Sequence, residues 1–114
     1  MISKELLSEI CQTNLMSLGK LEVVGSDICL YDCSMQPDIY MCWNIYELAH
    51  KCKEWASTHN YSVISGWEMT HWGGAYRVEV FRNSNNILFS MSTVDTEPEA
   101  IFKACQWILD KELA

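Results

Sequence analysis

The stretch that decides the fold is residues 75–109, AYRVEVFRNSNNILFSMSTVDTEPEAIFKACQWIL. Apolar and polar side chains largely alternate over residues 75–81 and again over 87–92, and the polar run 83–86 separates the two segments. Alternation over two short segments joined by a turn predicts a β-hairpin. The sequence TEPE at 96–99 then precedes apolar residues at helical spacing, which predicts a capped helix.

The start of this helix has the sequence of a capping box. We expect the Thr96 hydroxyl to accept a hydrogen bond from the backbone N–H of Glu99, and the Glu99 carboxylate to reach back to Thr96. Pro98 lacks an N–H at a position where no helical partner exists, and Glu97 favours the positive end of the helix dipole. These residues fix where the helix begins, but they name no reaction.

The first half of the chain gives weaker patterns. Ser3 is expected to cap a first helix that ends near Gly19. Alternating apolar residues around 25–27 predict two short strands, or one strand and an irregular loop, and residues 33–36 are expected to form a loop. Pro37 and the broad apolar face that follows it predict a central helix over 37–58.

These elements predict a single α+β domain over residues 1–114. A strand begins at Tyr61, and a turn over 68–74 joins it to the strand at 75–81. The order is helix, short β segment, helix, three-stranded antiparallel meander and helix, because successive strands with short connections pair as a meander. Helices on one face of this sheet would give two layers, and helices on both faces would give three.

The charge of the chain is strongly acidic and unevenly distributed. The formal net charge is -7, and no lysine or arginine falls between Lys20 and Lys51. This surface repels nucleic acid and anionic lipid, so we expect no direct binding to DNA, RNA or membrane. The stretch is either a solvated face or a patch that docks on a basic protein groove. Its carboxylates are Glu22, Asp27, Asp32, Asp38 and Glu47.

The expected oxidation state of the cysteines depends on the cellular compartment. The apolar run at 39–46 is too short to span a bilayer, and residues 3–5 do not open a signal peptide, so a cytoplasmic location is expected. Cytosolic thiols are usually reduced, although the even count of six leaves a disulfide framework open. Four of them are expected on or beside the apolar faces of helices as reduced thiols: Cys11, Cys42, Cys52 and Cys105.

Three segments resemble a known family. Residues 34–39 (SMQPDI) with 43–48 (WNIYEL) resemble the start of the central helix of the phage ABA-sandwich family, small proteins of tailed phages and prophages. Residues 94–104 (VDTEPEAIFKA) are similar to the family's closing segment, and 4–7 (KELL) resemble its first helix. The resemblance implies an α/β/α layered sandwich and a phage origin, and it implies no enzymatic activity.

A rival fold has the same order of elements. Double-stranded RNA-binding domains also place a three-stranded meander between two helices, and they hold phosphate with lysines at the start of the last helix. Here that place carries Glu97 and Glu99, with only Lys103 nearby. The charge therefore argues against this rival.

Residues 66–74, GWEMTHWGG, hold the sharpest cluster of functional side chains. They form either a long hairpin connection that folds back over the sheet or an exposed anchor for a partner. Glu68 and His71 would be the acid–base pair of an enzyme, but no nucleophile accompanies them. Cys29 and Cys33 lack the second pair of ligands that a zinc site needs, so we expect no metal and no cofactor.

We therefore predict a non-enzymatic protein that acts by binding another protein. The predicted partner is a host defence nuclease, inhibited in an anti-CRISPR-like way in the host cytoplasm, with carboxylates in place of phosphates in its basic groove. A small-ligand binder or nucleotide sponge that uses the loop 67–72 is the alternative. A homodimer, through edge pairing of the meander or through the tryptophan loop, is a further option. The predicted partner-binding residues are Asp27, Asp32, Asp38, Glu47, Trp67, Glu68, His71 and Trp72.

Overall fold

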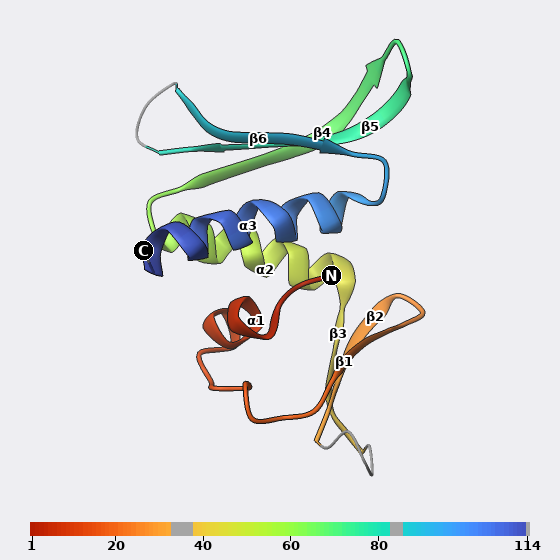
Figure 1. The fold of residues 1–114 in the computed structure, drawn as a ribbon, viewed down its shortest axis with the longest axis vertical. Coiled ribbons are helices and arrows are strands. Elements are labelled where there is room, and N and C mark those ends of the chain that lie inside the picture. The colour runs from red at the N-terminus through yellow and green to blue at the C-terminus, as the bar shows by residue number, and fades with distance from the viewer. Residues whose placement is uncertain (33–37, 83–85, 114) are drawn as a thin grey trace.

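The computed structural model describes residues 1–32, 38–82 and 86–113, which form three helices and two three-stranded antiparallel sheets (Figure 1). The helices are α1 (Lys4–Cys11), α2 (Ile45–Thr58) and α3 (Glu97–Leu113). The strands of the first sheet are β1 (Leu21–Val24), β2 (Asp27–Tyr31) and β3 (Ile39–Asn44). Those of the second sheet are β4 (Ser62–Thr70), β5 (Gly73–Phe81) and β6 (Ile87–Thr93). The α+β class is confirmed.

The helices α2 and α3 lie between the two sheets rather than outside one of them. The sheet β4-β5-β6 packs one face on α2 and α3, and α1 with the sheet β1-β2-β3 lies on the far side of these helices (Figure 1). Among the described elements no helix covers the other face of β4-β5-β6. The predicted α/β/α sandwich is therefore not confirmed as the layout.

The main core lies between β5 and the two long helices. Val78 and Val80 of β5 are fully buried, and Phe102 and Ile108 of α3 are buried with them in one cluster. The predicted meander and its alternation are confirmed, because Val78 pairs with Ser65 on one side and with Met91 on the other. The inward side chains of β5 therefore anchor the sheet to α3.

The predicted central helix over 37–58 is wrong in its first part. Residues 39–44 form β3, which pairs with β2, and the helix α2 begins only at Ile45. Asn44 caps it, since its Oδ1 accepts hydrogen bonds from the backbone N–H groups of Tyr46 and Glu47 at 3.0 and 3.2 Å. Residues 39–43 include β-branched and aromatic side chains that suit a strand, and an asparagine N-cap marks a helix start.

The other helix ends agree in part with the sequence. Ser3 caps α1 as predicted, with Leu6 N donating to its Oγ at 3.1 Å, but α1 ends at Cys11 because Gln12 takes the left-handed conformation (φ 54°). The Thr96 cap is also confirmed, since Glu99 N donates to Thr96 Oγ1 at 3.3 Å. The predicted reach of the Glu99 carboxylate back to Thr96 is wrong, because this carboxylate instead contacts the amino group of Met1 at 2.7 Å.

Of the two alternatives predicted around 25–27, the structure forms the hairpin of two short strands, β1 and β2, which pair from Leu21↔Leu30 to Val24↔Asp27. The predicted loop 33–36 and most of the predicted turn 83–86 lie outside the described residues. In the described chain, no helix combines the length and the apolar character needed to cross a bilayer.

The molecule is elongated. Its principal extents are 46 × 32 × 21 Å and its radius of gyration is 15.0 Å, against about 13 Å for a compact domain of this length. The β4–β5 hairpin reaches one end of the long axis, and the sheet β1-β2-β3 reaches the other (Figure 1). The outer parts of the β4–β5 hairpin and of the sheet β1-β2-β3 therefore lie away from the main core.

Candidate functional site

The segment 66–74, predicted as a loop, is mostly strand. β4 and β5 pair as far as Thr70↔Gly73, which leaves His71 and Trp72 as a two-residue turn. Thr70 Oγ1 donates to the Gly73 carbonyl at 2.7 Å and accepts from Trp72 N at 3.2 Å. Gly73 has a φ of 112°, a conformation that side chains disfavour. The turn is therefore short and internally bonded.

Large apolar side chains are exposed around this turn. Trp72 is 97% exposed, Met69 71% and Trp67 58%. We call these three residues and His71 the hairpin tip. Figure 1 shows the β4–β5 hairpin extending beyond the layer of helices, so the fold supplies no cover for these side chains. Exposed apolar surface concentrated at one place is typical of protein interaction sites.

Trp67 is held against the hairpin itself. Its ring meets Tyr76 edge-on, with centroids 4.9 Å apart and an interplanar angle of 72°. Its six-membered ring lies over Gly74, where a β-carbon would overlap it. Gly74 therefore makes room for the indole, and Trp67 rests in a defined position on one face of the hairpin.

The other face of the hairpin carries an ion-pair network. Arg77 Nε donates to Glu79 Oε1 at 2.7 Å, and Arg77 Nη1 lies 3.6 Å from Glu68 Oε2. Glu68 thus pairs with Arg77, whereas His71 lies in the exposed turn and forms no hydrogen bond or ion pair with Glu68 within the described chain. The acid–base pair that an enzyme would have needed from these two residues is not present, because Glu68 lies within β4 beside the Arg77 cation of β5.

The acidic residues that were predicted to bind a partner lie in two separate groups. Asp27 pairs in register with Asn44, whose side chain bonds the backbone of Glu47, so Asp27 and Glu47 lie near the start of α2. Asp32 N donates to the Asp38 carbonyl at 2.8 Å, which places these two together at the other end of β2. Asp27 and Asp32 are five positions apart along extended chain, or about 17 Å.

The carboxylates and the tryptophans do not form the single surface that the sequence suggested. The acidic groups lie on or beside the sheet β1-β2-β3. The end of β2 and the start of β3, beside Asp32 and Asp38, reach the end of the long axis opposite the β4–β5 hairpin, whereas the start of α2, near Asp27 and Glu47, lies closer to the middle (Figure 1). We call Asp32 and Asp38 the acidic end. The sequence did not indicate that the carboxylates and the tryptophans are far apart, because this separation results from the packing of α2 and α3 between the two sheets.

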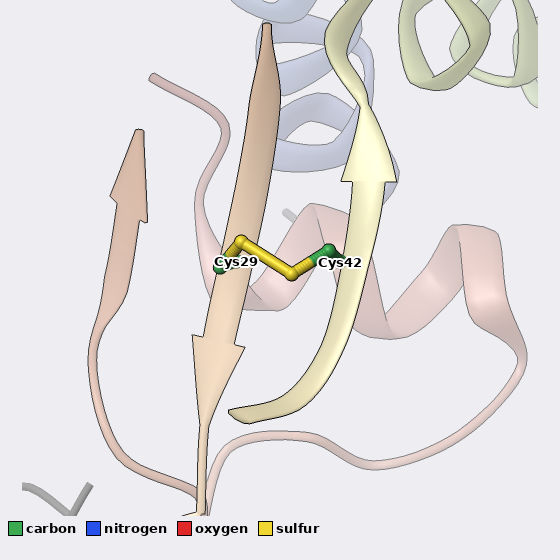
Figure 2. The surroundings of a disulfide bond; sticks show 2 residues. All are labelled: Cys29 and Cys42. Carbon is green, nitrogen blue, oxygen red and sulfur yellow. A yellow bond between two sulfur atoms is a disulfide. The ribbon is translucent and has the colours of Figure 1, made fainter. Parts of the chain in front are cut away.

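A disulfide that the sequence did not pair joins Cys29 to Cys42. The two residues lie opposite each other on β2 and β3, with Cα atoms 4.2 Å apart (Figure 2). The expectation of a reduced Cys42 on a helix is wrong, because this residue belongs to an extended strand. Cys33, the other half of the Cys29 pair weighed as a zinc site, lies outside the described residues.

The remaining described cysteines are free thiols, as expected. Cys52 and Cys105 are fully buried between α2 and α3, and Cys11 is half-buried. The neighbouring Cys105 and burial raise the pKa of the Cys52 thiol, so it stays protonated. Across residues 1–32, 38–82 and 86–113, no three His, Cys, Asp or Glu side chains are grouped so that they could hold a metal ion.

No family model matches the chain, and searches of curated proteins and of solved structures also find no match. The resemblance to the phage ABA-sandwich family therefore stays a prediction. Any assignment of function has to come from the chain's own surfaces, of which the hairpin tip is the most unusual.

Proposed function

We propose that this protein is a non-enzymatic binding protein that docks on another protein through the hairpin tip. The observation that carries the proposal is Trp72, which is 97% exposed at the end of a tight turn, next to Met69 and Trp67. Tryptophan is enriched among the residues that dominate binding energy at protein interfaces.

The exposed area of the hairpin tip and its internal contacts favour binding. A tryptophan side chain buries about 150–250 Å² when covered, which corresponds to about 4–6 kcal/mol of transfer free energy at about 25 cal/mol per Å². Only part of this appears as affinity, since association and side-chain ordering oppose it. The Thr70 hydroxyl bonds and the packing of Trp67 on Gly74 hold the tip in one arrangement, which reduces the ordering term.

The charge of the chain supports a basic partner. With a net charge of -7, the protein is attracted to positively charged protein surfaces, and the groove of a host defence nuclease is the partner class that we propose. The acidic end, which lies away from the hairpin tip, would be a second contact surface, and it is the one that would face such a groove. Binding there should weaken as salt rises, because exposed charges are screened.

The host cytoplasm is the compartment that we propose for such an inhibitor. Cytosolic proteins rarely keep disulfides, so Cys29 and Cys42 should be thiols in the cell. Protein recovered from cells under thiol alkylation tests this point by mass. An intact Cys29–Cys42 bond in that sample would contradict the cytoplasmic assignment.

The hairpin tip is tested by capture experiments with matched variants. Trp72→Ser removes the most exposed aromatic side chain, and Tyr46→Ser removes another exposed one, from α2. We expect a protein captured by the wild type and by Tyr46→Ser to be lost from Trp72→Ser by about 30-fold, the effect of about 2 kcal/mol at a dominant contact. Equal capture by all three proteins would exclude the tip as the contact.

The nucleotide-binding alternative has less support. The hollow beside Trp67 has a volume of about 290 Å³, at the lower limit for ligand pockets, and Glu68, Arg77 and Glu79 line it. Arg77 pairs with both carboxylates, and the remaining negative charge disfavours a bound phosphate. A rise in melting temperature with any common nucleotide would favour the alternative over protein binding.

A further inference from the structure

The strand β6 presents an open edge. In the described chain it pairs with β5 on one side, and no strand lies on its other side. Its sequence, ILFSMST, lacks the charged residues and proline that commonly protect an edge. A bulge falls at Leu88, because Val80 pairs with Phe89 and Phe81 with Ile87. The regular part, 89–93, directs the N–H and C=O of every second residue outward.

Two lysines accompany this strand. Trp107 of α3 stacks on Phe89, with centroids 5.4 Å apart and an interplanar angle of 23°. Lys103 and Lys111 lie four residues before and after Trp107, so all three share one face of the helix. Lys111 Nζ is 4.9 Å from the Trp107 ring centroid. Lys103, Trp107 and Lys111 form what we call the lysine stripe, which runs beside β6.

The lysine stripe has no carboxylate partner in the described chain, although the protein is acidic. Among residues 1–32, 38–82 and 86–113, no ion pair within 4.0 Å involves Lys103 or Lys111. The carboxylates nearest in sequence have other contacts: Glu99 with the amino group of Met1, Asp110 with the Gln106 amide, and Glu112 with the Tyr61 hydroxyl. Two ammonium groups therefore remain available beside an open strand.

We propose that β6 accepts an extended acidic segment of a partner protein as an added strand. The backbone of the segment would bond the outward N–H and C=O groups of 89–93, as in other cases of strand addition. Its carboxylates would pair with Lys103 and Lys111. This surface is separate from the hairpin tip, so the inference does not depend on the proposed function.

Charge distinguishes this occupant from a second copy of the chain. Pairing of β6 with β6 of another copy about a two-fold axis would extend the sheet and bring the two α3 helices to the same side. The lysine stripes of both copies would then lie together, and like charges in proximity are unfavourable. An acidic segment added at the same edge instead brings its carboxylates beside the ammonium groups of Lys103 and Lys111.

The test uses synthetic peptides and full-length protein. The probe is a fluorescent seven-residue peptide of alternating valine and glutamate, and the controls replace glutamate with lysine or methylate alternate backbone nitrogens. We expect the acidic peptide alone to bind, and to slow hydrogen exchange at the amides of 89–93. Absence of binding at millimolar peptide, or equal binding of either control peptide, would overturn the proposal.

Charge reversal tests the lysine stripe. Lys103→Glu with Lys111→Glu should weaken binding of the acidic peptide about tenfold or more, since two exposed ion pairs are lost and repulsion replaces them. The matched control, Lys51→Glu with Lys53→Glu on α2, changes the net charge equally and should have little effect. Equal weakening by both pairs would show only a general charge effect and would refute the site.

Two further results separate this inference from its rivals. Trp72→Ser should leave peptide affinity unchanged, because the hairpin tip is another surface. Sedimentation should give a monomer at micromolar concentration. A dimer that persists in Trp72→Ser and slows hydrogen exchange at the amides of 89–93 would assign the β6 edge to a second copy and overturn the proposal.

Discussion

A methyl group at Gly74 provides a sharp test of how the hairpin holds Trp67. In Gly74→Ala the new β-carbon would overlap the six-membered ring of Trp67, so the indole has to leave its place against Tyr76. Gly66→Ala is the matched control, since nothing lies within 4 Å of its added β-carbon and neither glycine has a positive φ. Both variants add the same atoms to the same strand pair.

The expected difference follows from the buried part of Trp67. The residue is 58% exposed, so the packing covers somewhat less than half of an area of about 200 Å², or about 2 kcal/mol at about 25 cal/mol per Å². Loss of the edge-on ring pair adds about 0.5–1.5 kcal/mol. Replacing glycine by alanine in a strand gains about 0.5–1 kcal/mol, which both variants share. The free energy of unfolding should therefore be about 2.5–3.5 kcal/mol lower for Gly74→Ala than for Gly66→Ala.

Urea unfolding, followed by circular dichroism, measures this difference at equilibrium. Tryptophan fluorescence of the folded proteins should also shift to longer wavelength in Gly74→Ala only, because Trp67 becomes more hydrated. Equal free energies of unfolding for the two variants would refute the packing of Trp67 on Gly74. The same result would also contradict the inference that the hairpin tip is held in one arrangement.

Three further changes test other parts of the fold. Thr96→Ala should lower the free energy of unfolding by about 1 kcal/mol, since it removes the N-cap bond of α3, and unchanged thermal stability would contradict that cap. Replacing Cys29 and Cys42 by alanine should lower it by up to about 3 kcal/mol, the loop-closure value for a sequence separation of 13. Dithiothreitol should then destabilise the wild type but not this double variant. Burial, followed by the hydrogen bond to Glu112, raises the pKa of Tyr61, so the folded state retains a proton that the unfolded chain loses. Stability should fall as the pH rises above about 10, and Tyr61→Phe should remove that part of the fall, as alkaline denaturation curves would show.

The confirmed parts of the fold are those with strong local signals. The alternation over 75–81 and the cap at Thr96 each combine pattern with a boundary residue, so β5 and the start of α3 were predictable. The central helix was predicted too long because its apolar residues continue upstream without a break in hydrophobicity. The asparagine at 44, a good N-cap, was the signal that marked the true start.

The site was less predictable because it depends on distant contacts. The Cys29–Cys42 pairing requires the register of β2 with β3, and no spacing rule supplies that register. The tryptophans of 66–74 were singled out from the sequence as candidate contacts, but the paired length of β4 and β5 decides that Trp72 projects from a tight turn. The lysine stripe passed unnoticed, since its meaning comes from the stacking of Trp107 on Phe89.

The elongated shape has a consequence for how the protein could act. The acidic end and the hairpin tip are separated along a 46 Å axis, so a partner seated at one end leaves the other end accessible. Two proteins held at these ends would form a ternary assembly in which the chain is a short, stiff spacer. Each would then experience the other at an effective concentration in the millimolar range, without any contact between them in the free state.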